Sequence, residues 1–132
     1  MTPTRYTRTS SPPRPRATPI CRTSLALFAA ASGDHNPIHL DPDAARRAGA
    51  DDVFAQGMLS MAYLGRLLKD RIPQGRIRTF RVRFAAITPV HGEPTCRARI
   101  TAVQDGLATL EISVALSDGT TTLIGDATVA VD

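Results

Sequence analysis

Hydrophobic and polar positions divide the chain into a helical first half and a second half built of strands. The earliest regular element is an apolar run from Leu25 to Ala31. Thr23 or Ser24 caps its start, and Gly33 supplies the left-handed residue that ends a helix. This pattern predicts a short helix that stops just before a cluster of polar residues.

Two further helices are predicted between residues 41 and 70. Asp41 as N-cap, Pro42 at the first helical position and Gly49 at the end enclose a short surface helix over 43–48. The longest helix covers 57–70, and we expect its first half to be almost wholly buried. Its apolar residues at helical spacing are Met58, Met61, Ala62, Gly65 and Leu68.

The rest of the chain alternates in the period of a half-buried strand. Phe80, Val82, Phe84 and Ala86 alternate with Arg81, Arg83 and Ala85, and residues 95–103, 107–117 and 121–131 look alike. Asp105-Gly106 and Asp118-Gly119 stand between these runs, where tight hairpin turns need positive φ. The pattern predicts an α+β fold in which a curved antiparallel sheet wraps around the central apolar helix.

Composition limits the domain plan and the partners. Residues 1–19 hold five of the ten prolines together with arginines and no acid, which predicts a disordered or loosely attached tail before one domain over 20–132. Tryptophan is absent and aromatics make up 5%, so we expect no nucleic-acid partner. The longest apolar run is too short to span a membrane.

The two cysteines, Cys21 and Cys96, have neither the spacing of a metal site nor that of a redox motif. This favours a location in the reducing cytoplasm. The sequence does not decide whether the two form a disulfide.

Chemistry concentrates in the eight residues from Ser32 to His39. They contain a carboxylate at Asp34, imidazoles at His35 and His39, and the turn-forming pair Asn36-Pro37. Such a turn brings Asp34 and His39 together, and an imidazole and a carboxylate are suited to general acid/base catalysis. His35 is expected to be solvent-exposed.

The start of the long helix supplies a second half of the site, at Gln56, Gly57 and Met58. A helix N-terminus offers free N–H groups to an oxygen that gains negative charge, and glycine lets a ligand approach the backbone. A proton-transfer pair beside such a group is what reversible hydration of an α,β-unsaturated thioester requires. Ser60 and Tyr63 are interpreted as packed hydroxyls, and His91 as a turn residue without a metal.

These residues also carry a resemblance to a known family. The segment SGDHNPIHLD over 32–41, followed by QGML over 56–59 and VRFAAITPVHGE over 82–93, resembles the MaoC-like (R)-specific enoyl hydratases and 3-hydroxyacyl-thioester dehydratases of hot dog fold. The resemblance covers roughly residues 22–131. It implies that Asp34 and His39 are catalytic, that Asn36 shapes their loop, and that the Gly57 amide binds the thioester oxygen.

The resemblance further implies an acyl group on coenzyme A or acyl carrier protein and no cofactor or metal. It also implies a homodimer or a hot dog heterodimer. Gln56 replaces the usual His of the family, and Gly65 stands where some members have Ser. Two alternatives therefore stay open: a non-catalytic or partner-dependent subunit of a heterodimeric dehydratase, and a polyketide-tailoring dehydratase or cyclase.

Overall fold

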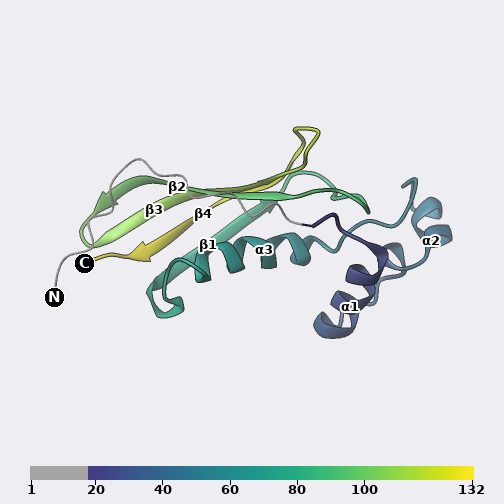
Figure 1. Ribbon diagram of the computed structural model, residues 1–132, viewed down its shortest axis with the longest axis horizontal. Coiled ribbons are helices and arrows are strands. Elements are labelled where there is room, and N and C mark those ends of the chain that lie inside the picture. The colour runs from purple at the N-terminus through teal and green to yellow at the C-terminus, as the bar shows by residue number, and fades with distance from the viewer. Residues whose placement is uncertain (1–17) are drawn as a thin grey trace.

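Four antiparallel strands form one curved sheet in the computed structural model, which describes residues 18–132 (Figure 1). The strands β1 (Ile77–Phe84), β2 (Thr95–Gln104), β3 (Leu107–Ala115) and β4 (Thr121–Ala130) lie in the order β1-β4-β3-β2. The last three strands form the predicted meander, and β1 pairs with β4 at the far edge. Asp105 and Gly106 both have positive φ in the β2–β3 turn, as predicted.

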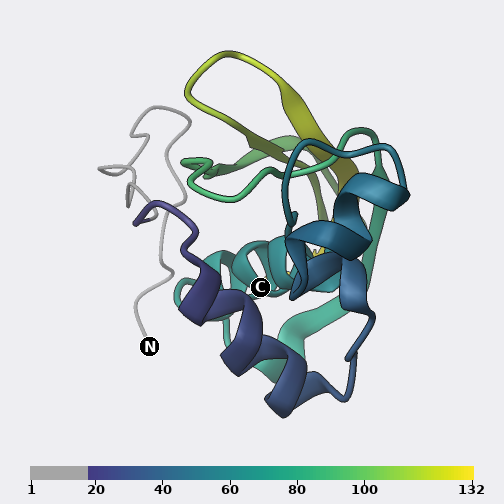
Figure 2. The same cartoon turned by 90° about the vertical axis from the view of Figure 1, so that its right-hand side faces the viewer.

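The helices precede the sheet in the chain. They are α1 (Arg22–Ser32), α2 (Pro42–Arg47) and α3 (Gly57–Lys69), with short 3₁₀ turns at Pro37–His39 and Gln74–Arg76. In Figure 1, α3 runs along one face of the sheet, while α1 and α2 gather beyond its first residue; Figure 2 shows this end of the molecule face on. The catalytic loop predicted between α1 and α2 therefore lies near the N-terminus of α3.

Sequence patterns placed the helix ends well, with one error. Asp41 caps α2 by accepting a hydrogen bond from the Asp43 N–H at 2.9 Å, and Gly33 ends α1 with φ of 78°. The N-cap of α1 is Cys21, not Thr23 or Ser24, and its side chain makes no capping hydrogen bond. The helix begins earlier than predicted because Thr23 and Ser24 take part in its first turn.

Two groups of buried side chains stabilise this arrangement. In the larger group, Leu64 and Leu68 of α3 pack on inward-facing residues of the sheet such as Leu110 and Ile112. The smaller group holds α1 and α2 to the start of α3 through Leu25, Ala45, Leu59 and their neighbours. Together they fix where the loop before α2 sits relative to α3.

The prediction that the first half of α3 is almost wholly buried is wrong. Leu59, Ser60 and Leu64 are buried, but Met58 is 55% exposed and Ala62 is exposed. The helix carries apolar residues on several sides, but the sheet covers only one of them. Among the described residues, nothing fully covers the apolar side chain of Met58.

The tail predicted over residues 1–19 lies almost entirely outside the described residues. Thr18 and Pro19 are the part of it that the structure describes, and both have exposed side chains. Ile20 is the first buried residue after them, and its backbone forms hydrogen bonds with His91 and Gly92.

Candidate active site

The loop that follows α1 is bent by its own side chains. The carboxylate of Asp34 accepts a hydrogen bond from the Asn36 N–H at 3.3 Å, and the side-chain oxygen of Asn36 accepts one from the Ile38 N–H at 3.2 Å. Two such turns in succession, the second of which contains Pro37, fold the segment back on itself. As a result Asp34 and His39, five positions apart, face each other.

The imidazole of His39 is held in one orientation. Its side chain is nearly buried, and its Nδ1 lies 2.7 Å from the carbonyl oxygen of Phe54. A carbonyl oxygen only accepts, so Nδ1 carries the ring proton and Nε2 keeps its lone pair when the ring is neutral. The ring of Phe54 also meets the imidazole edge to face, with centroids 5.2 Å apart.

His39 and Asp34 are paired across a short gap. The Nε2 atom of His39 lies 3.7 Å from Oδ2 of Asp34, beyond the range of a good direct hydrogen bond. At this separation, a water molecule or a substrate hydroxyl beside the pair can bond to both groups. The structure therefore brings the two predicted catalytic side chains together.

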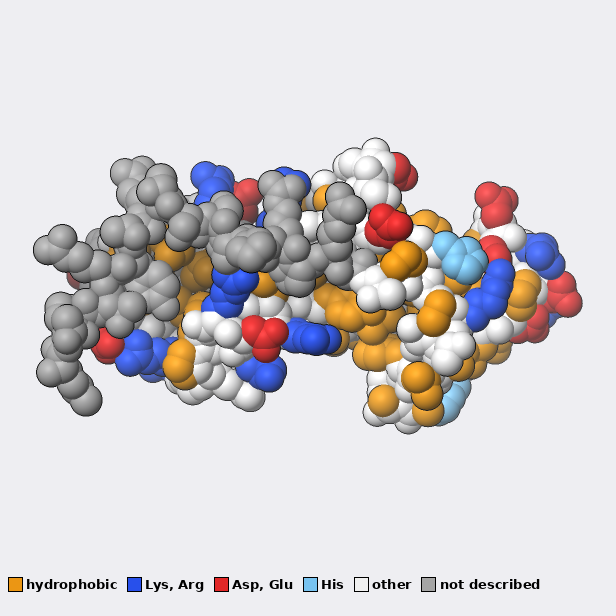
Figure 3. Space-filling model, viewed as in Figure 1, with side chains coloured by type: hydrophobic (Ala, Val, Ile, Leu, Met, Phe, Trp, Pro, Cys, Tyr) orange, Lys and Arg blue, Asp and Glu red, His pale blue; other side chains and the backbone are white. Residues whose placement is uncertain are grey.

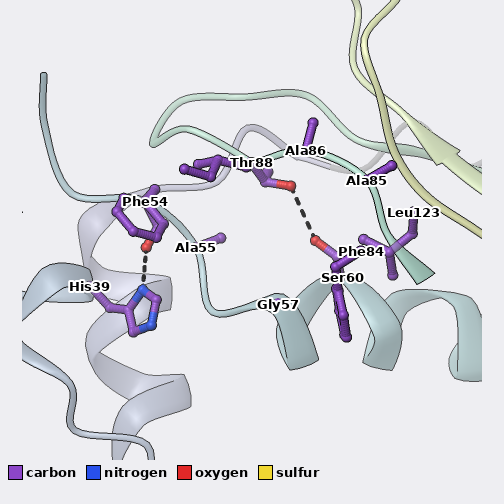
Figure 4. Close-up of a pocket in the computed structure, with 11 residues that line it drawn as sticks. His39, Phe54, Ala55, Gly57, Ser60, Phe84, Ala85, Ala86, Thr88 and Leu123 are labelled. Carbon is purple, nitrogen blue, oxygen red and sulfur yellow. Dashed lines mark hydrogen bonds between the residues drawn. The ribbon is translucent and has the colours of Figure 1, made fainter. Parts of the chain in front are cut away.

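A cavity of about 310 Å³ opens beside His39 and extends along the start of α3. Its lining is mainly apolar, with two exceptions besides His39 (Figure 4). The residues that line it are His39, Phe54, Ala55, Gly57, Ser60, Phe84, Ala85, Ala86, Ile87, Thr88 and Leu123. The cavity thus joins the imidazole to the N-terminus of the central helix.

Gly57 begins α3 on the wall of this cavity. The preceding residue, Gln56, makes no side-chain capping hydrogen bond, so the first N–H groups of the helix stay available to a ligand. The Phe84 ring lies against Gly57: a Cβ added there would be 2.9 Å from Cε1 of Phe84. A Cβ at position 57 would therefore push the Phe84 ring aside.

The other predicted site residues lie elsewhere. Asn36 acts on the loop backbone. Gln56 is fully buried and its Nε2 donates to the carbonyl oxygen of Leu25 at 3.0 Å, while Met58 points its side chain mostly into solvent. Of the predicted site residues, only His39 and Gly57 line the cavity, and Asp34 reaches it through His39. His35 is exposed, as expected.

Sequence reasoning missed several residues of the site. The carbonyl group of Phe54 orients His39. A sequence pattern does not indicate which backbone carbonyl group accepts a hydrogen bond from a distant side chain. Ser60 and Thr88 line the cavity and are hydrogen-bonded to each other at 3.3 Å. The signal in the sequence is a serine within the apolar start of the central helix, a pattern that by itself indicates only a packed hydroxyl group.

An ion pair fixes the segment that carries the Phe54 carbonyl group. The guanidinium group of Arg22 binds both carboxylate oxygens of Asp52, two residues before Phe54. This hydrogen-bonded partner, together with the Val53 N–H, holds the pKa of the Asp52 carboxyl well below its usual range. The ion pair links the start of α1 to the strand-like segment against which His39 rests.

Comparison with known proteins identifies the family. The MaoC like domain matches residues 6–123. The chain belongs to this family of dehydratases. A curated relative, the (R)-specific enoyl-CoA hydratase of Aeromonas caviae, is 31% identical over 109 residues, which are 80% of this chain and 81% of that protein.

Other relatives agree with this assignment. The 3-hydroxyacyl-thioester dehydratase X of Mycobacterium tuberculosis is 38% identical over 74 residues, or 56% of this chain, and the chain spans only 26% of that longer protein. The solved structure of the (R)-hydratase from A. caviae involved in PHA biosynthesis superposes with a TM-score of 0.80 at 26% identity, covering 94% of this chain and 98% of that one. The predicted hot dog fold is confirmed.

Two further findings concern metals and membranes. Within residues 18–132, no group of three or more His, Cys, Asp or Glu side chains has the geometry of a metal site. Among the helices of the same region, none combines the length and the apolar character needed to cross a bilayer.

Proposed function

We propose that this chain catalyses the reversible hydration of trans-2-enoyl thioesters to (R)-3-hydroxyacyl thioesters. The observation that carries the proposal is the pairing of Asp34 with the lone-pair nitrogen of His39 across 3.7 Å, beside a cavity that reaches the N-terminus of α3. The names of the relatives point to the same chemistry, the addition or removal of water at an acyl thioester.

In the hydration direction, a water molecule bridges Asp34 and His39 by bonding to both. The neutral Nε2 of His39 takes one proton from this water while its oxygen forms the bond to C3 of the substrate. The π electrons of the double bond move toward the thioester oxygen. The imidazolium then delivers its proton to C2, which returns His39 to its neutral form and completes the addition.

Three groups stabilise this reaction. The carboxylate of Asp34 accepts the second hydrogen bond of the water. Its negative charge also stabilises the positive charge that forms on His39. The Phe54 carbonyl group, 2.7 Å from Nδ1, keeps the imidazole in the productive orientation. The N–H of Gly57 donates to the thioester oxygen as that oxygen gains negative charge. Dehydration follows the same steps in reverse.

Coenzyme A or an acyl carrier protein bears the acyl group in this proposal. A reducing cytoplasm is the proposed location, which the free thiols of Cys21 and Cys96 support. A second hot dog chain is the proposed partner, identical or different, because apolar side chains of β2 are exposed at an edge of the sheet.

Asp34→Asn and His39→Ala test the reaction. With crotonyl-coenzyme A, hydration is followed as loss of the ultraviolet absorbance of the conjugated thioester. We expect each variant to lower kcat/KM by about 10²- to 10⁴-fold, the usual contribution of a positioned acid or base. His35→Ala, which changes an exposed neighbour in the same loop, is the matched control and keeps its activity. Turnover retained in both Asp34→Asn and His39→Ala, with native circular dichroism, would refute the proposal.

The partner-dependent alternative is favoured by one observation and opposed by another. The exposed apolar residues of β2 and α3 are consistent with a missing partner. Gly65, one of the two departures that motivated this alternative, does not line the cavity; it faces the ring of Phe80, with Cε1 3.4 Å from an added Cβ. Position 65 therefore contacts β1 and not the cavity, so glycine there gives no reason to expect an inactive site.

A further inference from the structure

Two buried hydroxyl groups face each other inside the cavity. The Oγ of Ser60 lies 3.3 Å from Oγ1 of Thr88, and the two side chains are only 1% and 4% exposed. Figure 4 shows them reaching toward one another from α3 and from the segment that follows β1. Apart from His39, they are the polar side chains in a cavity lining that is mainly apolar.

This pair is not needed to hold the two segments together. The Ala55 N–H donates to the Thr88 carbonyl oxygen at 2.8 Å, and Phe54 pairs with Pro89 as an isolated β-bridge. These backbone contacts already fix Thr88 beside the start of α3. The hydroxyl groups are therefore free to serve the cavity.

The hydrogen bonds of the pair are incomplete. Each hydroxyl has one proton, and one hydrogen bond between them uses only one of the two protons. Within residues 18–132, neither hydroxyl makes another hydrogen bond. The pair therefore offers an O–H donor and unused lone pairs to whatever occupies the cavity.

We propose that Ser60 and Thr88 select acyl groups that carry an oxygen beyond the reacting double bond, as a hydroxyl or keto substituent. This inference rests on the proposed function, because it uses the Gly57 amide to place the thioester oxygen. Ser60 follows Gly57 by three residues, about 4.5 Å along the helix axis. That distance corresponds to several bonds of an extended chain, so C5 is the position to probe.

The preference arises because a plain hydrocarbon chain cannot form a hydrogen bond with the pair. An alkyl group next to the pair excludes water and leaves a buried donor without an acceptor, which weakens binding. A substrate oxygen at the same place accepts that hydrogen bond. Sites that hydrogen-bond a substrate hydroxyl discriminate against the analogue that lacks it for this reason.

Binding of two matched, non-reacting thioesters tests the inference. Hexanoyl-coenzyme A and 5-hydroxyhexanoyl-coenzyme A are titrated by calorimetry into the full chain and three variants. We expect the wild type to bind the hydroxylated thioester about tenfold more tightly, the effect of one net hydrogen bond. Thr88→Val and Ser60→Ala remove this preference. Thr122→Val is the matched control, because Thr122 is equally buried, bonds to the Val114 carbonyl group and lies outside the cavity lining.

Two results would overturn the inference. One is equal affinity of the wild type for both thioesters, which needs no variant and so does not depend on whether a variant folds. The other is a preference that survives in Thr88→Val, or that disappears equally in Thr122→Val. Failure of the proposed function appears separately, as absence of enoyl-thioester turnover in a chain that still shows the binding preference.

Discussion

The Nδ1 atom of His39 has a neutral backbone acceptor, whereas the Nε2 atom faces a carboxylate. The carbonyl oxygen of Phe54 accepts a hydrogen bond from the Nδ1–H group, which leaves the Nε2 lone pair directed at the gap in front of Asp34. The other tautomer would place the ring proton on Nε2 and leave no lone pair facing Asp34. The residue types alone do not distinguish these arrangements, so the proton-accepting atom follows only from the structure.

Gln56 shows how a buried amide can be half satisfied. Its Nε2 bonds to the Leu25 carbonyl group, but its Oε1 has no hydrogen-bond partner among the described residues. We predict that Gln56→Leu changes the free energy of unfolding by less than about 1 kcal/mol, because losing one hydrogen bond is offset by removing an unpaired oxygen. Gln56→Ala leaves a cavity and lowers it by about 2–4 kcal/mol. Urea denaturation measures both; an equal loss in the two variants would contradict this account.

The two cysteines are predicted to differ in reactivity. A hydrogen bond with the Ser24 hydroxyl group lowers the pKa of the exposed Cys21 thiol, and burial raises the pKa of Cys96 to about 11. Because the thiolate is the reactive form, we expect an alkylating reagent near neutral pH to modify Cys96 roughly a hundredfold more slowly than Cys21. Mass spectrometry after timed quenching measures the two rates. Cys21→Ser removes the fast phase, and a single rate for both thiols would contradict the prediction.

At the scale of elements, α3 approaches β1 through glycine. Gly57 and Gly65 lie eight residues apart on the helix, and the rings of Phe84 and Phe80 lie against them. At these two contacts a ring on β1 lies against a glycine on α3, and the first of them places Phe84 on the cavity wall.

Gly57→Ala tests this contact. The added Cβ displaces the Phe84 ring into the cavity, so we expect kcat/KM for crotonyl-coenzyme A to fall about tenfold while thermal stability is unchanged or slightly higher. Phe84→Leu in the same chain provides the space for the methyl group and recovers part of the loss. A double-mutant cycle of the two substitutions isolates their coupling, and strictly additive effects would show that the ring and the glycine do not interact.

Elements were predictable where local chemistry decides them. The Asp41 cap, the Gly33 terminus and the Asp105-Gly106 turn act within a few residues, and the structure has them where the sequence placed them. The convergence of Asp34 and His39 was predictable because Asn36-Pro37 bends a short loop. Burial along α3 and the Ser60–Thr88 contact depend on which distant segment packs there, and no local pattern encodes that partner.

At the scale of the whole molecule, two of the places where apolar side chains are exposed bear on function. Ile100 pairs with Leu110 across β2 and β3, so both point to the same face of the sheet, yet Leu110 is buried and Ile100 is 44% exposed. Val103 on the same strand is 63% exposed. The second place is the start of α3 near the cavity, where Met58, Phe84 and Ile87 are exposed. Figure 3 shows hydrophobic side chains gathered toward this end of α3.

Strand β2 is the better candidate for a contact between chains. It lies at the edge of the sheet, its residues 97–104 are all exposed, and an edge strand with apolar side chains tends to pair with another strand. Pairing along β2 extends the sheet across two chains and covers Ile100 and Val103. In a homodimer this contact is made twice by the same residues, so one substitution changes both sides of the interface.

Val103→Lys and Ile100→Lys therefore test assembly. We expect the wild type to have the mass of a dimer by size-exclusion chromatography with light scattering, and each variant to shift toward the monomer, because each chain then places a charged group on a surface that would be buried. Leu27→Lys is the matched control: Leu27 is 66% exposed on α1, outside the proposed contact, and its variant keeps the dimer. A wild-type monomer that hydrates crotonyl-coenzyme A would rule out dependence on any partner. A wild-type monomer without activity, which gains activity with a second hot dog chain and loses it again with Val103→Lys, would instead place a different chain on the same edge.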